Sequence, residues 1–368
     1  MCEQTKTIKY QRLKTRLFIL DICVSFLVVV IFQMFFSFPA AYFFENSAGN
    51  FYLACACYVA LFYFFIHLTG MPLHFFGSFT VEHRFGLSNQ SIKAWMIDEA
   101  KSAALSLLFY VSGGLVFYFI LRTFPDIWWA ILAVIWFFFS CFMARMLPVL
   151  IIPLFYKYIP LEEGQLKNMI MGLGKQAGID LSDVCKIDLS RKTKKANAAL
   201  VGLGSTKKVV LADTLMSSFS EEEIGTVVAH EFAHCKFNHI WKLILISACI
   251  TALSFWLLSA IVGNIAVMLG ASGASDIGIL PAIMLCMMCF GLLVMPLQNF
   301  ISRCLEREAD RFALEIMKDP GAFISAMERL AEMNLAERDP GLIKKIMLYD
   351  HPPIAERIRM AQNFQAKH

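Results

Sequence analysis

The chain has 368 residues, of which 58% are hydrophobic and only 17% are charged, and its net charge is +4. Soluble chains average about 45–50% apolar and about 25% charged residues, so this composition excludes a disordered chain, a secreted disulfide scaffold and an ordinary soluble enzyme. It indicates a polytopic α-helical membrane protein. The 11 Cys have no spacing typical of a disulfide framework or a Cys-rich zinc site. We expect the basic residues to mark cytoplasmic loops, with no nucleic-acid partner.

Six apolar segments are long enough to cross a bilayer, which takes about 20 residues. They cover residues 17–44, 51–70, 101–121, 127–147, 240–268 and 278–301. The first is too long for a cleaved signal peptide. Lys and Arg gather in the N-terminal segment and in residues 71–100, 148–239 and 302–368, whereas the alternate connections carry only Arg122. The sequence therefore predicts that both termini and the two long polar segments lie on the cytoplasmic side of the membrane.

This pattern predicts a mainly α fold in four parts. They are an N-terminal membrane domain (1–150), a cytoplasmic segment (151–239), a membrane hairpin of two spans (240–301) and a C-terminal cytoplasmic segment (302–368). Within the polar segments we expect a helix at 162–177, strands at 183–189 and 208–213, and an extended, Gly-punctuated stretch at 196–205. Helices broken at Pro320, Pro340 and Pro352–Pro353 should follow residue 304. The two segments would form one small α+β domain.

The motif H-E-F-A-H at 230–234 indicates a metal site in that domain. Ser220 and Glu223 form a capping-box pattern that should open a helix just upstream. On that helix His230 and His234 are four residues apart, so both imidazoles face the same side and can bind one Zn²⁺. Glu231 lies beside the metal, where it can accept a proton from a water molecule and pass it to a leaving amine.

A zinc site of this kind needs a third protein ligand. The end of the last span offers Glu306, Glu308 and Asp310, and the membrane hairpin returns the chain to the side that carries the motif. Glu306 and Asp310 share a helix face, so one can bind the metal while the other orients a ligating histidine. We favour Glu306 as the ligand. The alternative is a solvated helix face, because arginines alternate with these acids.

Together the motifs resemble those of the integral-membrane CAAX prenyl endopeptidases, zinc metallopeptidases that remove the last three residues of prenylated CAAX sequences. The resemblance includes H-E-F-A-H, then S-R-x-x-E-x-x-A-D after a membrane hairpin, then D-H-P-P-I-A-E-R at 350–357. It extends to N-A-A-L-V-G-L-G-S-T-K-K-V-V-L-A-D-T-L at 197–215 and to the loop E-H-R-F-G-L-S-N-Q-S at 82–91. Eukaryotic members are described with seven spans, against six here, and the short chain suits a bacterial-type member.

The resemblance implies a zincin-like catalytic domain and a role for each matching residue. By that resemblance His230, His234 and Glu306 bind one Zn²⁺, Glu231 is the general base and Asp310 buttresses a ligand. His351 and Arg357 would line the active site and steady the substrate or the oxyanion. Asn197 and Ala198 would belong to a strand whose backbone pairs with an extended substrate. The expected partners are a peptide or protein substrate, possibly lipidated, and the lipid bilayer.

Two alternatives remain open. One is a membrane quality-control protease similar to the HtpX group, which typically has four spans. The other is a catalytically silent membrane scaffold that keeps the zinc fold, although such a scaffold would have no need of Glu231. Of the remaining histidines, His239 would lie about 140° around a continuous helix from His234, so we interpret it as a membrane-interface residue. His67 and His74 receive the same interpretation.

Overall fold

The computed structural model describes residues 3–202 and 206–366. Within them, six helices are long and apolar enough to cross a membrane, as the sequence predicts. They are Thr5–Ala48, Phe51–Arg84, Ile92–Thr123, Trp128–Phe155, His239–Met268 and Ile277–Met317. Each is longer than its apolar segment because helical turns continue into the polar sequence at its ends.

The first four of these helices precede the polar part of the chain. Three of them contain a π-helical turn, at Phe32–Ser37, Phe76–Thr80 and Leu147–Ile151. The helical pieces are α1 (Glu3–Ile31), α2 (Phe38–Ser47), α3 (Phe51–Phe75), α4 (Val81–Arg84), α5 (Ile92–Thr123), α6 (Trp128–Met146) and α7 (Ile152–Phe155). Asn50 caps α3 by accepting from the N–H of Tyr52, and Ser91 caps α5 through the N–H of Ala94.

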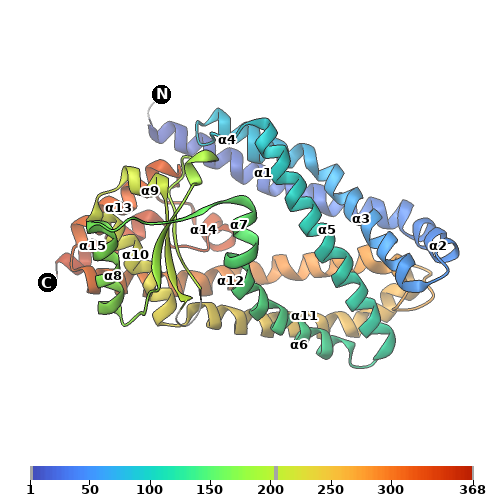
Figure 1. Cartoon of the computed structure of the whole chain (residues 1–368). Helices are drawn as coiled ribbons and strands as arrows, with labels where there is room; N and C mark the ends of the chain where they lie inside the picture. The colour runs from blue at the N-terminus through green and yellow to red at the C-terminus, as the bar shows by residue number, and fades with distance from the viewer. Residues whose placement is uncertain (1–2, 203–205, 367–368) are drawn as a thin grey trace.

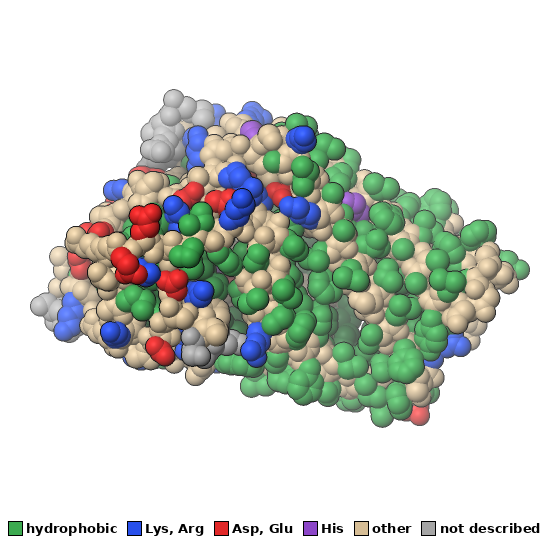
Figure 2. Space-filling model, in the orientation of Figure 1, with side chains coloured by type: hydrophobic (Ala, Val, Ile, Leu, Met, Phe, Trp, Pro, Cys, Tyr) green, Lys and Arg blue, Asp and Glu red, His purple; other side chains and the backbone are tan. Residues whose placement is uncertain are grey.

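The remaining two long helices are α11 (His239–Met268) and α12 (Leu280–Met317), and a 3₁₀ turn at Ile277–Ile279 leads into α12. In Figure 1 α1 and α3 lie along one side of the molecule and α6, α11 and α12 along the other, α5 crosses from the first side to the second, and both termini lie at the same end. Apolar side chains cover the surface of the long helices, whereas acidic and basic side chains gather at the end that holds the termini (Figure 2). This distribution is what a lipid-embedded bundle with one polar end requires.

The polar end, which we call the polar domain, is built around a four-stranded sheet. Its strands are β1 (Tyr158–Pro160), β2 (Asp183–Ile187), β3 (Ala198–Val201) and β4 (Lys208–Ala212), in the order β1-β2-β4-β3. β2 and β4 are parallel, and the two outer pairs are antiparallel. β3 is thus an edge strand, and it confirms the predicted extended stretch, of which residues 203–205 lie outside the described residues.

Short helices complete the polar domain around the second half of α12. They are α8 (Gln165–Ala177), α9 (Asp213–Ser218), α10 (Glu221–Lys236), α13 (Pro320–Met333), α14 (Leu342–Leu348) and α15 (Ile354–Gln365), with a 3₁₀ turn at Leu189–Arg191. The helix predicted at 162–177 begins three residues late, after Gly164. The predicted breaks near Pro320, Pro340 and Pro352–Pro353 are confirmed.

Packing of α10 against α12 fixes the geometry of the polar domain. Ile224, Val228 and Phe232 recur every four residues on α10 and are almost completely buried in the main core. Burying each such side chain contributes roughly 1.5–3 kcal/mol. Where the two helices contact, α12 supplies Ala309 and Ala313, both fully buried. Small side chains let two helix backbones approach closely, so the motif helix lies directly beside the last part of a membrane-spanning helix.

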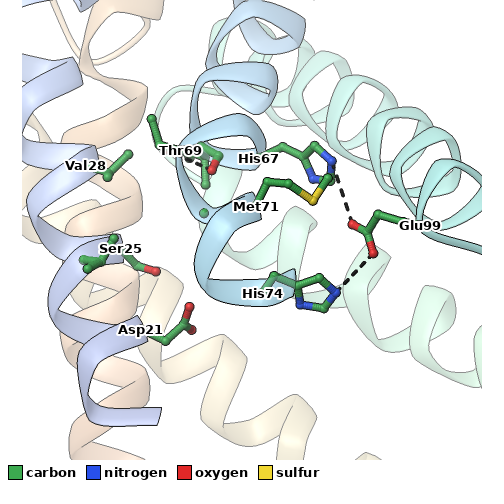
Figure 3. Close-up of a pocket in the computed structure, with 11 residues that line it drawn as sticks. Asp21, Ser25, Val28, His67, Thr69, Met71, His74 and Glu99 are labelled. Carbon is green, nitrogen blue, oxygen red and sulfur yellow. Dashed lines mark hydrogen bonds and ion pairs between the residues drawn. The ribbon is translucent and has the colours of Figure 1, made fainter. Parts of the chain in front are cut away.

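A cavity of about 230 Å³ lies among α1, α3 and α5 (Figure 3). Asp21 of the first span lines this cavity. On α3, His67 and His74 both point toward Glu99 of α5, with Nε2 atoms 3.8 and 3.1 Å from its two oxygens. These contacts join two membrane helices through polar groups that would be costly to expose to lipid.

Candidate metal centre

Three side chains converge where α10 meets α12. A complete capping box at Ser220 and Glu223 starts α10, and His230 and His234 follow on one face of it. Their Nε2 atoms lie 3.2 Å apart. The carboxylate of Glu306 on α12 lies 3.1 Å from Nε2 of His230 and 3.4 Å from Nε2 of His234. One ligand atom from each residue lies within 4.8 Å of the others, so the structure brings the three predicted ligands together.

The donor set fits a divalent metal ion. Two imidazole Nε2 atoms that face each other cannot both be satisfied by a hydrogen bond between them unless one carries a proton. Oε2 of Glu306 is buried and, although it lies 3.1 Å from Nε2 of His230, it accepts no hydrogen bond from the described residues. Unsatisfied buried acceptors are rare, and here several lone pairs point at one position. Two imidazoles and one carboxylate are a ligand set that suits Zn²⁺ and leaves a fourth position for water.

Asp310 and Arg357 support His230, one of the three predicted ligands, at its other ring nitrogen. Asp310 is fully buried on α12, and its Oδ1 lies 2.9 Å from Nδ1 of His230. Arg357 of α15 donates to both oxygens of Asp310, at 2.8 and 2.5 Å. Burial lowers the pKa of His230, but the carboxylates of Asp310 and Glu306 outweigh burial and raise that pKa to about 9. A more basic imidazole is a stronger metal ligand.

His239 supports the second histidine, and the interpretation of His239 as a membrane-interface residue is wrong. It is fully buried, its Nδ1 lies 3.0 Å from Nδ1 of His234, and its Nε2 lies 3.1 Å from Glu308. The prediction failed because α10 ends at Lys236 and α11 begins at His239, with Asn238 between them at φ 56°. Asn is a residue that ends helices in this left-handed conformation, and it was the signal in the sequence that the helix is not continuous.

A pocket of about 370 Å³ opens beside the predicted ligands. Its lining includes Glu231, His351, Arg357, Asn197 and Ala198, so every residue predicted from the family motifs either lines the pocket or contacts a ligand beside it. Burial raises the pKa of Glu231, which moves this carboxylate toward the range that a general base needs near neutral pH. Burial, together with the charge of His230, lowers the pKa of His234 to about 4.

His351 lies at the mouth of the pocket. Its Nε2 is 3.4 Å from Glu306 and its Nδ1 is 2.9 Å from the carboxylate of Asp350, which raises the pKa of His351 although burial opposes it. The segment that precedes His351, residues 345–349, is held by two residues of α12 that sequence reasoning missed. Arg303 donates to the carbonyl oxygens of Lys345 and Tyr349, at 2.9 and 2.5 Å.

The second of these residues is Asn299, which donates to the carbonyl of Met347 at 2.6 Å. On α12, Arg303 lies about one turn and Asn299 about two turns before Glu306. The helix that supplies the predicted third ligand therefore also anchors the segment that carries His351. Side-chain contacts to backbone over such separations leave no periodic signal in the sequence.

Comparisons with known proteins identify relatives of this chain. Residues 160–365, more than half of the chain, match peptidase family M48, and residues 3–157 match the N-terminal membrane domain of CAAX prenyl proteases, described with five membrane helices. The chain is 31% identical over 324 residues to CAAX prenyl protease 1 of Saccharomyces cerevisiae, covering 82% of this chain and 70% of that protein. It is 28% identical to an uncharacterized metalloprotease, YhfN, of Bacillus subtilis, covering 80% and 70%.

The fold is also similar to a solved structure. The crystal structure of S. mikatae Ste24p matches with a TM-score of 0.85 at 27% identity, covering 98% of this chain and 89% of that one. In residues 3–157, four long helices correspond to the domain described with five. The M48 family implies a metal cofactor, which the convergence of two histidines and a glutamate accommodates. The chain therefore belongs to peptidase family M48 and is an integral-membrane metalloendopeptidase related to the CAAX prenyl proteases.

Proposed function

We propose that this protease is a zinc enzyme that cleaves peptide bonds near the C-terminus of membrane-associated substrates, in particular prenylated CAAX proteins. The observation that carries the proposal is the position of Glu306. It lies on the continuation of a membrane-spanning helix and converges with the histidines of α10 beside an open edge strand. The names of the yeast, plant and animal relatives support the choice of substrate.

His230, His234 and Glu306 would hold the zinc ion, which supplies a Lewis acid for the attacking water and the scissile carbonyl. Glu231 would accept the proton of that water and deliver it to the leaving amine. Asp310 would fix the tautomer and orientation of His230, with Arg357 neutralising its buried charge. His351 would donate to the oxyanion or to the substrate backbone from the mouth of the pocket.

The edge strand β3 would bind the substrate. Asn197 and Ala198 line the pocket at the start of this strand, and an extended peptide added to a sheet edge is held through main-chain hydrogen bonds with little demand on its sequence. A protease that recognises a lipid anchor and a chain end has no need of deep side-chain pockets, so this mode of binding suits the proposed substrates.

The depth of the site relative to the membrane also suits a lipid-anchored chain. Along α12, Glu306 lies about 39 Å from Leu280 at 1.5 Å per residue, and the hydrocarbon core is about 30 Å thick. The proposed metal would then lie near the level of the lipid headgroups. The distribution of Lys and Arg supports the cytoplasmic side for the site and both termini. It also supports the division into 1–150, 151–239, 240–301 and 302–368.

The test offers purified protein three substrates, each with and without a chelator: a prenylated CAAX peptide, its unprenylated twin and an unfolded membrane protein. Chelator-sensitive cleavage of the prenylated peptide alone is the expected result. Equal cleavage of all three would favour the quality-control alternative, against which six long helices and the match to the N-terminal CAAX protease domain already count. No cleavage at full zinc occupancy would favour the scaffold.

A further inference from the structure

Toward the start of β3, two contacts close its outer edge. The backbone of Leu87 and Asn89 pairs with Lys194 and Lys192, and between that pairing and β3 one side chain covers the edge. In an antiparallel pair, residues whose N–H and C=O face the neighbouring strand alternate with residues whose groups point away. The carbonyl of Asn197 accepts from the N–H of Ala212, the last residue of β4. Two residues earlier, the carbonyl of Lys195 accepts from the side-chain hydroxyl of Thr214 at 2.7 Å, also on the β4 side. The backbone groups of Ala196, Ala198 and Leu200 therefore face the outer edge, where a substrate strand would pair.

At Ala196 this edge is already occupied. The side-chain amide of Asn334 accepts from the N–H of Ala196 at 3.1 Å, and its Nδ2 lies 3.5 Å from the carbonyl oxygen of the same residue. One amide side chain thus takes both backbone groups that an added strand would use there. Asn334 and Ala196 line the same pocket as Glu231, so this contact lies at the end of the groove that leads to the metal centre.

The chain maintains Asn334 in this position at an energetic cost. Asn334 ends α13, and the next residue, Leu335, has a φ of 47°. This left-handed conformation is usual for Gly at a helix end and costs a residue such as Leu roughly 1–2 kcal/mol. Leu335 is buried in a cluster with Tyr10 of α1, and its carbonyl accepts from Gln11 at 2.6 Å. Strained backbone that its surroundings enforce is a mark of a functional position.

The direction of the substrate follows from the same strand. Antiparallel pairing is the more stable arrangement, and a peptide that runs antiparallel to β3 has its C-terminal end beside the start of the strand, next to Ala196. We propose that Asn334 is a specificity-determining residue that blocks the substrate strand beyond Ala196 and so limits how many residues can follow the scissile bond. The inference rests on the proposed function and gives a structural reason for cleavage near a chain end.

The experiment uses the full-length protein in detergent with a prenylated CAAX peptide and versions extended by one or two residues at the C-terminus or at the N-terminus. For the wild type, C-terminal extension should reduce kcat/KM, and N-terminal extension should not. Asn334→Ala should relieve the C-terminal penalty about three- to tenfold, the effect of one or two hydrogen bonds. It should also release C-terminal fragments of more than one length. Asn334→Asp keeps the acceptor for Ala196 and should preserve most of the penalty.

Asn363→Ala, on the exposed face of α15, is the matched control and should leave the penalty unchanged. An unchanged penalty in Asn334→Ala at wild-type zinc content would overturn the proposal. If that variant does not fold, Gln11→Ala loosens the same turn and must shift the penalty in the same direction. If the wild type cleaves only unprenylated peptides, the proposed substrate is wrong, and the same extension series on those peptides still decides the role of Asn334.

Discussion

Nδ1 of His239 lies 3.0 Å from Nδ1 of His234, so one of these two nitrogens must donate a proton to the other. Nε2 of His234 points to the metal centre, which leaves Nδ1 of that ring as the donor. His239 then accepts at Nδ1 and donates from Nε2 to Glu308. The three side chains form one hydrogen-bonded chain that fixes the tautomer in which His234 can bind a metal.

We therefore expect His239→Ala to lower zinc affinity about 10- to 100-fold, the usual cost of removing a partner of a metal ligand. Competition with a chromophoric chelator measures the affinity. His239→Gln can both accept and donate, so it should recover part of the loss. His83→Ala, at an exposed histidine of α4, should bind zinc as the wild type does. Equal affinity in His239→Ala and the wild type would show that the chain does not orient His234.

Glu231→Gln should reduce kcat about 10²- to 10⁴-fold, because the amide cannot accept the proton of the attacking water. Within the part of the chain that the structure describes, Glu231 makes no hydrogen bond or ion pair with either histidine, so zinc content and the apparent Tm should stay near those of the wild type. Metal analysis and thermal unfolding of the same preparation supply these controls. A variant that cleaves peptide at the wild-type rate with zinc bound would exclude Glu231 as the base.

Residues on one helix face could be predicted from the sequence, whereas contacts between distant segments could not. Helical periodicity places His230 beside His234, and the membrane hairpin returns Glu306 to the same side, so the ligand set follows from spacing and topology. The contact between His239 and His234 was not predicted because a single residue, Asn238, breaks the helix. Arg303 and Asn334 bind backbone groups more than 40 and 130 residues away, and no local pattern encodes such contacts.

Arg303→Met should lower kcat about 10- to 100-fold, because the segment before His351 loses its anchor and small displacements near a reacting group are costly. The effect should nearly vanish when His351 is already Ala, which a double-mutant cycle on kcat measures. Arg311→Met, at an exposed arginine two turns along α12, is the matched control. Additive losses in the cycle would mean that Arg303 acts on stability and not through His351.

Arg357→Met should destabilise the polar domain by about 3–5 kcal/mol, because it leaves the fully buried carboxylate of Asp310 without its partner. The apparent Tm in detergent at one scan rate reports the loss. Adding Asp310→Asn removes the buried charge and should restore part of the Tm while zinc affinity remains low. If the single variant unfolds at the wild-type temperature, the pair contributes little to folding.

Glu356 gives the polar domain a pH dependence that can be separated from catalysis. Its two oxygens lie 2.6 Å from Arg307 of α12 and 2.7 Å from Lys345 of α14. Partial burial raises the pKa of Glu356, but these two cations outweigh burial and hold the pKa below its ordinary value. Because the pKa of Glu356 is lower in the folded protein than in the unfolded chain, its stabilisation is present above the pKa of the unfolded state, about 4.3. This stabilisation is lost as the pH falls through the pKa of Glu356 in the folded protein.

The apparent Tm of the wild type should therefore decline more steeply than that of Glu356→Gln as the pH is lowered from about 5.5 to about 3.5. At pH 7 the variant should have the lower Tm, because the amide pairs weakly with Arg307 and Lys345. Glu315→Gln, at an exposed acid of α12, should follow the wild-type curve. Parallel curves of Tm against pH for Glu356→Gln and the wild type would mean that the ion pairs of Glu356 with Arg307 and Lys345 do not contribute to stability. Only a group whose pKa changes on folding can alter the slope of such a curve.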